Sequence, residues 1–176
     1  MKLLTAEEWN DLFTSTKREA LHLEMRDWYA VDDEKERFSR FLATGQRDHE
    51  AEAEERRPWL EAVRRATQMG VSIRRARIVS EPVTDYTRFL YEGTDRTIEA
   101  GEDVRWLPRK RASAIALPGN DFWLFDEKTV LINHFTGVGN SAGQELSTDP
   151  ALAELCKSAF EAVWKVAIPH GEYKVI

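Results

Sequence analysis

The side chains of this chain that could do chemistry are a few carboxylates and one histidine in its second half. Asp121 and Asp126 flank a short apolar run, and His134 follows the next one. Groups of this kind can accept and donate protons, so one hypothesis is a hydrolase that acts on a phosphorylated substrate. A lone histidine at the end of a predicted strand is more often structural or exposed than catalytic, and no motif pairs His134 with a nucleophile.

Other nucleophile and metal-ligand patterns are missing from the sequence. His22, His49 and His170 have no metal-ligand spacing with one another or with Cys156. Cys156 is the only cysteine and lies on an apolar helical stripe, which predicts a core residue and excludes an internal disulfide. The loop 137–143 is rich in glycine but is not a phosphate-binding loop, and no Gly-x-Ser-x-Gly elbow occurs. We therefore expect no catalytic residue, no metal and no cofactor.

Arginines form three basic clusters that could hold an anion, at 74–77, at Arg105 and at 109–111. Arginine forks suit phosphate, but they suit carboxylate equally, and the chain has 31 acidic residues with which they could pair. Direct binding of nucleic acid is a further hypothesis. The net charge of −6 and the lack of a recognisable helix-turn-helix argue against it.

The elements that must position these residues alternate between helix and strand, which is the order of an α/β fold. We predict strands over 20–28 (half buried), 71–79, 104–107, 122–125 and 130–132, then a flexible loop at 137–143 and a short strand. We predict helices that begin at Thr5, at Asp32 or Asp33, at Pro82 and at Asp149, and a further helix that Pro58 either starts or kinks. The helix from Pro82 is expected to be interrupted or loosened at Gly93.

The two helical crossovers imply that the first three strands are parallel neighbours. Their carboxyl ends would then share one edge of the sheet, where open α/β sheets bind ligands. Arg109 follows the third strand, so we expect it at that edge. The last helix carries an apolar stripe from Leu152 to Ala167, which we expect to cover the adjacent hairpin.

Length and composition limit the classes of protein to which this chain can belong. The 176 residues, with 42% hydrophobic and 32% charged side chains, suit a single domain with a sizeable core. We divide it into an N-terminal strand and helices over 1–69 and a main α/β core over 70–176. No apolar run approaches the ~20 residues of a membrane span. Glu7 and Glu8 interrupt the N-terminal apolar residues, so we expect a cytoplasmic protein without a membrane partner.

The stretch 120–167 resembles the second half of a phospholipase D-like domain, in which a His-x-Lys-x-x-x-x-Asp strand is followed by a tight turn, a second strand and an acidic-Pro helix. Asp126 matches the aspartate of that motif, and Asp149-Pro150 matches the helix start. Gly119 then stands at the position of the nucleophilic histidine and Asp121 at the position of the lysine. The resemblance implies a mixed sheet flanked by helices that has lost the phosphodiesterase chemistry.

Nearly the whole chain also resembles an uncharacterised actinobacterial family of unknown function, through stretches such as RRARIVSEPVTDYTRF, GEDVRWLPR and LPGNDFWLFD. Members are often encoded beside helix-turn-helix regulators, which implies such a regulator as partner. We therefore predict a non-catalytic regulatory or sensing domain that binds a small ligand or a regulator, with a homodimer as a further option. The predicted binding residues are Asp85, Tyr86, Arg88, Trp106, Arg109, Asn120, Asp121, Trp123 and His134.

Overall fold

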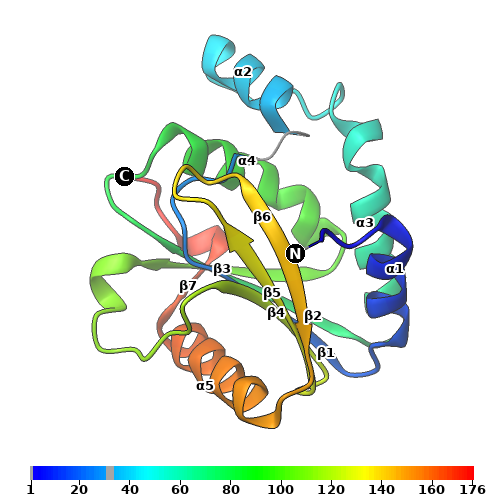
Figure 1. Ribbon diagram of the computed structural model, residues 1–176. Helices are drawn as coiled ribbons and strands as arrows, with labels where there is room; N and C mark the ends of the chain where they lie inside the picture. The colour runs from blue at the N-terminus through cyan, green and yellow to red at the C-terminus, as the bar shows by residue number, and fades with distance from the viewer. Residues whose placement is uncertain (1, 31–33) are drawn as a thin grey trace.

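A computed structural model describes residues 2–30 and 34–176. Within these residues one mixed sheet has seven strands in the order β6-β5-β4-β1-β2-β3-β7 (Figure 1). The strands are β1 (Glu19–Glu24), β2 (Ser72–Val79), β3 (Glu102–Pro108), β4 (Asp121–Phe125), β5 (Thr129–Phe135), β6 (Ser141–Ser147) and β7 (Ile168–Pro169). The helices are α1 (Ala6–Ser15), α2 (Lys35–Thr44), α3 (Ala53–Gln68), α4 (Asp85–Glu99) and α5 (Pro150–Val166), with short 3-10 helices at Arg109–Arg111 and His170–Glu172.

The strand pairing confirms the predicted mixed α/β sheet. β1, β2 and β3 are parallel neighbours, while β4, β5 and β6 form an antiparallel meander attached to β1. β1 therefore lies at the centre of the sheet, between β4 and β2. Two helical crossovers, through α3 and α4, connect the parallel strands.

α5 covers one face of the sheet, as the sequence predicts. Asp149 caps it by accepting a hydrogen bond from the Ala151 N–H at 2.9 Å, and Pro150 occupies its first turn. The helix lies across the sheet (Figure 1), and its apolar stripe packs on Leu21, Leu23 and other side chains of the central strands. Cys156 is 1% exposed within this layer, which confirms it as a core residue.

α1, α3 and α4 cover the opposite face (Figure 1). The Thr5 capping box predicted for α1 is present, with the Thr5 hydroxyl and the Glu8 carboxylate each accepting an N–H of the other residue. Phe13 of α1 and Trp123 of β4 meet edge to face at 5.4 Å between ring centroids. An aromatic layer therefore joins α1 to the sheet.

The first strand differs from its prediction in length and in burial. β1 ends at Glu24 rather than at Trp28, and both of its faces are covered. His22 and Glu24, which the alternation assigns to a solvent face, are each only 8% exposed. Helices lie over both sides of the sheet, and arginines of β2 neutralise the buried Glu24 carboxylate.

The predictions for two helices and one loop differ from the structure. α3 begins at Ala53, so Pro58 lies inside the helix and not at its start. α4 begins after Thr84, which caps it, and passes Gly93 without a break. The glycine leaves room for the Arg47 guanidinium, because a Cβ there would lie 2.5 Å from it. The loop predicted at 137–143 is shorter, since β6 begins at Ser141 and pairs with β5. The proposed cap of α2 at Asp32 or Asp33 lies outside the described residues.

Candidate functional site

The parallel strands end together at one edge of the sheet, which we call the carboxyl edge. Leu23 of β1 pairs with Phe122, so the antiparallel β4 begins at the same edge with Asp121. An open cleft of about 330 Å³ lies there. Its lining residues are Met25, Arg26, Asp27, Trp28, Arg109, Gly137 and Val138. This is the place where α/β sheets bind ligands, and the sequence places Arg109 in it correctly.

Arg109 joins the ends of the three parallel strands. Its Nη2 donates to the carbonyl oxygens of Met25 at 2.7 Å and Ile78 at 3.1 Å, and its Nε donates to the Ser80 hydroxyl at 3.0 Å. Asp27 completes the arrangement by accepting from the Ser80 N–H at 2.7 Å and by pairing with Arg109 at 3.3 Å. These contacts hold the guanidinium through Nε and Nη2 and fix the floor of the cleft.

Asp121 faces inward from the same edge. It is 3% exposed, accepts the Met25 N–H at 3.0 Å and accepts a hydrogen bond from the Tyr29 hydroxyl. Burial, reinforced by the charge of Glu24, raises the pKa of Asp121 to about 6. Burial likewise raises the pKa of Tyr29, so the phenol keeps its proton and remains the donor. The Asp121 carboxylate therefore already accepts hydrogen bonds from two groups of the protein itself, the Tyr29 hydroxyl and the Met25 N–H.

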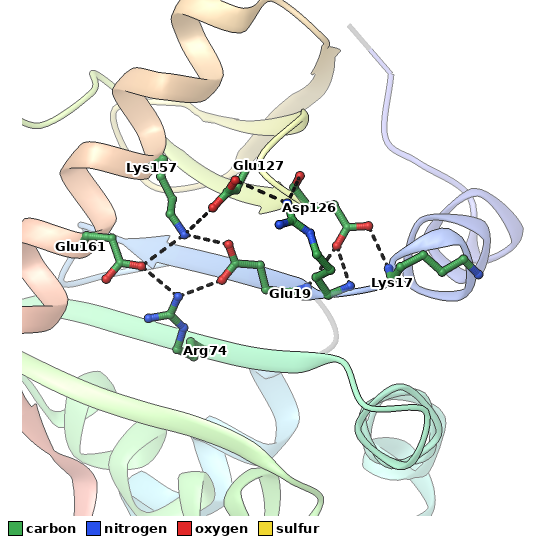
Figure 2. Close-up of polar contacts among 8 residues, drawn as sticks. Lys17, Glu19, Arg74, Asp126, Glu127, Lys157 and Glu161 are labelled. Carbon is green, nitrogen blue, oxygen red and sulfur yellow. Dashed lines mark hydrogen bonds and ion pairs between the residues drawn. The ribbon is translucent and has the colours of Figure 1, made fainter.

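The three positions that match the phospholipase D-like motif have separate roles. Gly119 is exposed, and a Cβ built on it would meet nothing within 4 Å. Asp121 is the buried group just described. Asp126, at the far end of β4, accepts the backbone N–H groups of Lys17, Arg18 and Glu19 at 2.8, 2.8 and 3.0 Å (Figure 2). Gly119 therefore offers no nucleophilic side chain, Asp121 is buried and hydrogen-bonded, and Asp126 lies at the other end of β4.

A charged network lies beside the Asp126 turn and ties α5 to the sheet. Figure 2 shows Lys157 of α5 pointing toward Glu19 and Glu127, at 2.7 and 3.1 Å. Arg74 of β2 bridges Glu19 at 2.9 Å and Glu161 at 2.8 Å. Arg74, which the sequence offers as part of an anion-binding cluster, is therefore engaged within the protein.

The rest of that cluster lies in a buried polar core on the α1/α3/α4 face. Arg75 pairs with Glu24 at 2.6 Å and with Glu102 at 2.7 Å, and Arg77 lies 2.8 Å from Glu24. Burial alone would raise the pKa of Glu24, but Arg77 and Arg75 outweigh it and hold that pKa at about 2. Burial lowers the pKa of His22, which stacks on Trp123 at 4.1 Å. Sequence reasoning did not find this core, because its members come from three different strands.

The predicted binding residues do not all lie at the carboxyl edge. Arg109 and Asp121 are there, and the exposed Asn120 is next to Asp121. Trp106 and Trp123 are 0% and 3% exposed on the α1/α3/α4 face.

The remaining predicted residues lie on α4 and on β5. Asp85 and Arg88 are exposed on α4, whereas Tyr86 is buried and donates to Glu34 at 2.6 Å. His134 follows the residue that pairs with Asp121 in β5, so the two side chains point to opposite faces of the sheet. His134 instead lies 3.3 Å from Glu145.

Arg26, Asp27, Trp28 and Val138 line the cleft but were missed by sequence reasoning. The first three were assigned to the first strand, whereas the strand ends at Glu24. The rule that residues after a parallel strand line the binding edge would have found them, had that end been placed correctly.

No group of three or more His, Cys, Asp or Glu side chains in residues 2–30 and 34–176 could hold a metal ion. In the same part of the chain, no helix combines the length and apolar character needed to cross a membrane.

Comparisons with known proteins extend the description. A family model described as "Domain of unknown function (DUF6879)" matches residues 7–175. No curated protein sequence matches the chain. Among solved structures, the chain is similar to a phospholipase D family member, Nuc from Salmonella typhimurium, with 12% identity and a TM-score of 0.52 over 91% of this chain and 86% of that one. This similarity confirms the predicted phospholipase D-like fold.

The chain is also similar to a second solved structure, that of TrmBL2, an archaeal chromatin protein. It has 14% identity and a TM-score of 0.48, over 92% of this chain and 49% of that one.

Proposed function

The chain belongs to the DUF6879 family, and we propose that it is a non-catalytic regulatory domain that binds a helix-turn-helix regulator at the carboxyl edge. One observation carries the proposal. Gly119 stands where the motif has its nucleophile, and Asp121, at the lysine position, is buried and hydrogen-bonded to Tyr29 and Met25. A carboxylate there would repel a phosphate, and glycine cannot attack it.

The side chains exposed at the cleft favour a protein partner. Trp28 and Val138 line the cleft and are 43% and 71% exposed, although both are apolar. Arg26 and Asp27 provide charged groups beside them. An apolar centre with a polar rim is the usual composition of a protein–protein interface. Exposed tryptophan is also among the residues that contribute most to binding energy at such interfaces.

The proposal is tested by measuring affinity for the adjacently encoded helix-turn-helix protein by isothermal titration calorimetry. Val138→Asp, which adds a charge without removing a core contact, is expected to weaken binding by at least ~10-fold. Leu155→Ala is the control, because Leu155 is 43% exposed, like Trp28, but lies on α5. Circular dichroism would verify that both variants are folded.

Three results would contradict the proposal. One is equal affinity of the Val138 and Leu155 variants for the regulator. Another is turnover of bis(p-nitrophenyl) phosphate that disappears in Asp121→Asn, which would favour the hydrolase. The third is duplex DNA binding by the isolated protein with a steep salt dependence, which would favour a nucleic-acid binder.

A further inference from the structure

A second and larger cavity lies on the other side of the sheet from α5. Its volume is about 630 Å³, within the range of small-molecule sites. Trp123, Arg75 and Arg77 of the sheet form its floor, and side chains of α1, α3 and α4 form its walls. It is distinct from the carboxyl-edge cleft, with which it shares no lining residue.

An aromatic wall of three side chains, Trp9, Phe13 and Trp59, continues onto Trp123 of the floor. Trp59 meets Phe13 at 5.4 Å and Trp123 at 5.8 Å between ring centroids, in both cases close to edge on. Trp9 and Trp59 are each partly exposed, whereas Phe13 and Trp123 are buried. The wall therefore offers ring surface on which a planar group can pack.

Arginines also line the cavity, and most of them already have carboxylate partners. The Arg75 guanidinium lies over the Trp59 and Trp123 rings, at 5.8 and 5.6 Å from their centroids. Arg75 is paired with Glu24 and Glu102, as described above. Arg47 is paired with the buried Glu52. The two carboxylates that line the cavity are also engaged, since Glu55 lies 3.3 Å from Arg37 and Glu34 accepts from Tyr86.

Arg56 and Arg77 retain buried donors that are not used, although Nε of Arg77 lies 2.8 Å from the Glu24 carboxylate. Nη1 of each is buried and has no hydrogen-bond partner among the described residues. Arg56 donates through Nη2 to the Gly93 carbonyl at 2.7 Å and to Thr97 at 3.3 Å, both neutral groups, and none of the ion pairs found in the described residues includes it. Burial, followed by the charge of Arg47, lowers the pKa of Arg56 to about 10, so it stays a cation at neutral pH. A buried donor without an acceptor is energetically unfavourable, because it has lost its hydrogen bonds to water.

We propose that this cavity binds a small planar anion, such as an aromatic carboxylate, whose ring packs on the tryptophan wall and whose acidic group is bound by Arg56 and Arg77. The anion supplies the acceptors that the two guanidinium groups lack. Charge-assisted hydrogen bonds of this kind are about twice as strong as neutral ones. The proposal does not depend on the regulator, because it concerns a different cavity.

The test is isothermal titration calorimetry of the full chain with 1-naphthoate and with its neutral analogue 1-naphthalenemethanol. We expect saturable binding of 1-naphthoate and at least ~10-fold weaker binding of the alcohol. Arg56→Gln is expected to weaken 1-naphthoate binding by at least ~10-fold. Arg57→Gln is the matched control, since Arg57 is the next residue of α3 and pairs with Glu54 and Glu61 at the surface.

A second variant keeps all the arginines and fills the cavity. Ala62→Phe adds a ring to a lining position of α3 and is expected to abolish binding of both probes. Equal affinity for the acid and the alcohol, equal affinity of the Arg56 and Arg57 variants, or no saturable binding of 1-naphthoate would each overturn the proposal. Val138→Asp, which tests the carboxyl-edge cleft, should leave 1-naphthoate binding unchanged, so the two proposals fail separately.

Discussion

At the scale of single residues, Asp121 shows how a position that matches a catalytic motif is used for structure. Its carboxyl group lies beside Glu24, is shielded from water and receives hydrogen bonds from Tyr29 and the Met25 N–H. The two donors favour the ionised form, but burial outweighs them. The group is therefore easier to protonate in the folded protein than in the unfolded chain.

This pKa shift predicts a pH dependence of stability that Asp121→Asn removes. The pKa of Asp121 is about 6 in the folded protein against 3.8 for the free side chain. Its stabilising contribution is complete below pH ~4 and is lost as the pH rises through 6. The free energy of unfolding of the wild type relative to Asp121→Asn should thus fall by on the order of 2–3 kcal/mol between pH 4 and pH 7.

Urea denaturation of both proteins across that interval is the measurement. All other titrating groups are common to the two chains, so they cancel in the difference. A relative stability that rises with pH would show that Asp121 is held as a carboxylate, and the assignment of a raised pKa would be wrong.

At the scale of elements, the β4–β5 hairpin depends on the aspartate of its turn. Asp126 and Glu127 both have positive φ, at 49° and 60°, as the two central residues of a type I′ turn require. The Asp126 carboxylate then caps the start of β1 by accepting three backbone N–H groups. These donors lower its pKa against the opposing effect of burial. The turn thereby anchors the hairpin to the entry of the central strand.

Replacing Asp126 by alanine should destabilise the protein by about 2 kcal/mol, since three N–H groups lose a charged acceptor. Glu127→Ala is a matched control, because it places the same residue at the neighbouring positive-φ position. Alanine at a positive-φ position destabilises both variants through the backbone. Glu127 contributes only surface ion pairs, so beyond that common effect the Glu127 variant should lose less than ~1 kcal/mol of stability. Thermal unfolding followed by circular dichroism measures both. Equal losses in the two variants would mean that the carboxylate cap adds nothing.

At the scale of the whole molecule, the sheet separates an apolar layer from a polar one. The α5 side is a continuous apolar core that includes Cys156. The opposite side combines aromatic rings with the buried Glu24, Arg75 and Arg77, and it holds the larger cavity. Conformational opening should therefore expose the two layers differently, with the α5 layer protected until the fold is lost.

Cys156 provides a test of that protection. It is 1% exposed, and burial raises the pKa of its thiol to about 11. Reaction with Ellman's reagent at pH 8 should be at least ~100-fold slower in the native protein than in 6 M guanidinium chloride, because both exposure and the thiolate require unfolding. Rapid modification of the native protein would show that α5 detaches from the sheet on its own.

The sequence by itself determined the elements whose signals are local. The hairpin 122–132, the capped α5 and the parallel order of the first three strands follow from periodicity, caps and crossovers within short windows. The resemblance to the phospholipase D-like motif, which aligns Gly119 and Asp121 with its histidine and lysine, also comes from the sequence alone.

Only the tertiary structure decided which polar residues share a site. Arg109 binds backbone atoms that lie 31 and 84 residues away, and Trp123 lies in a cavity with Arg56 of a helix far earlier in the chain. Strand alternation predicts that a side chain points up or down, but it does not say what covers that face. Burial and charge neutralisation depend on that cover, so the polar core and the arginine-lined cavity became visible only once the helices were placed on the sheet.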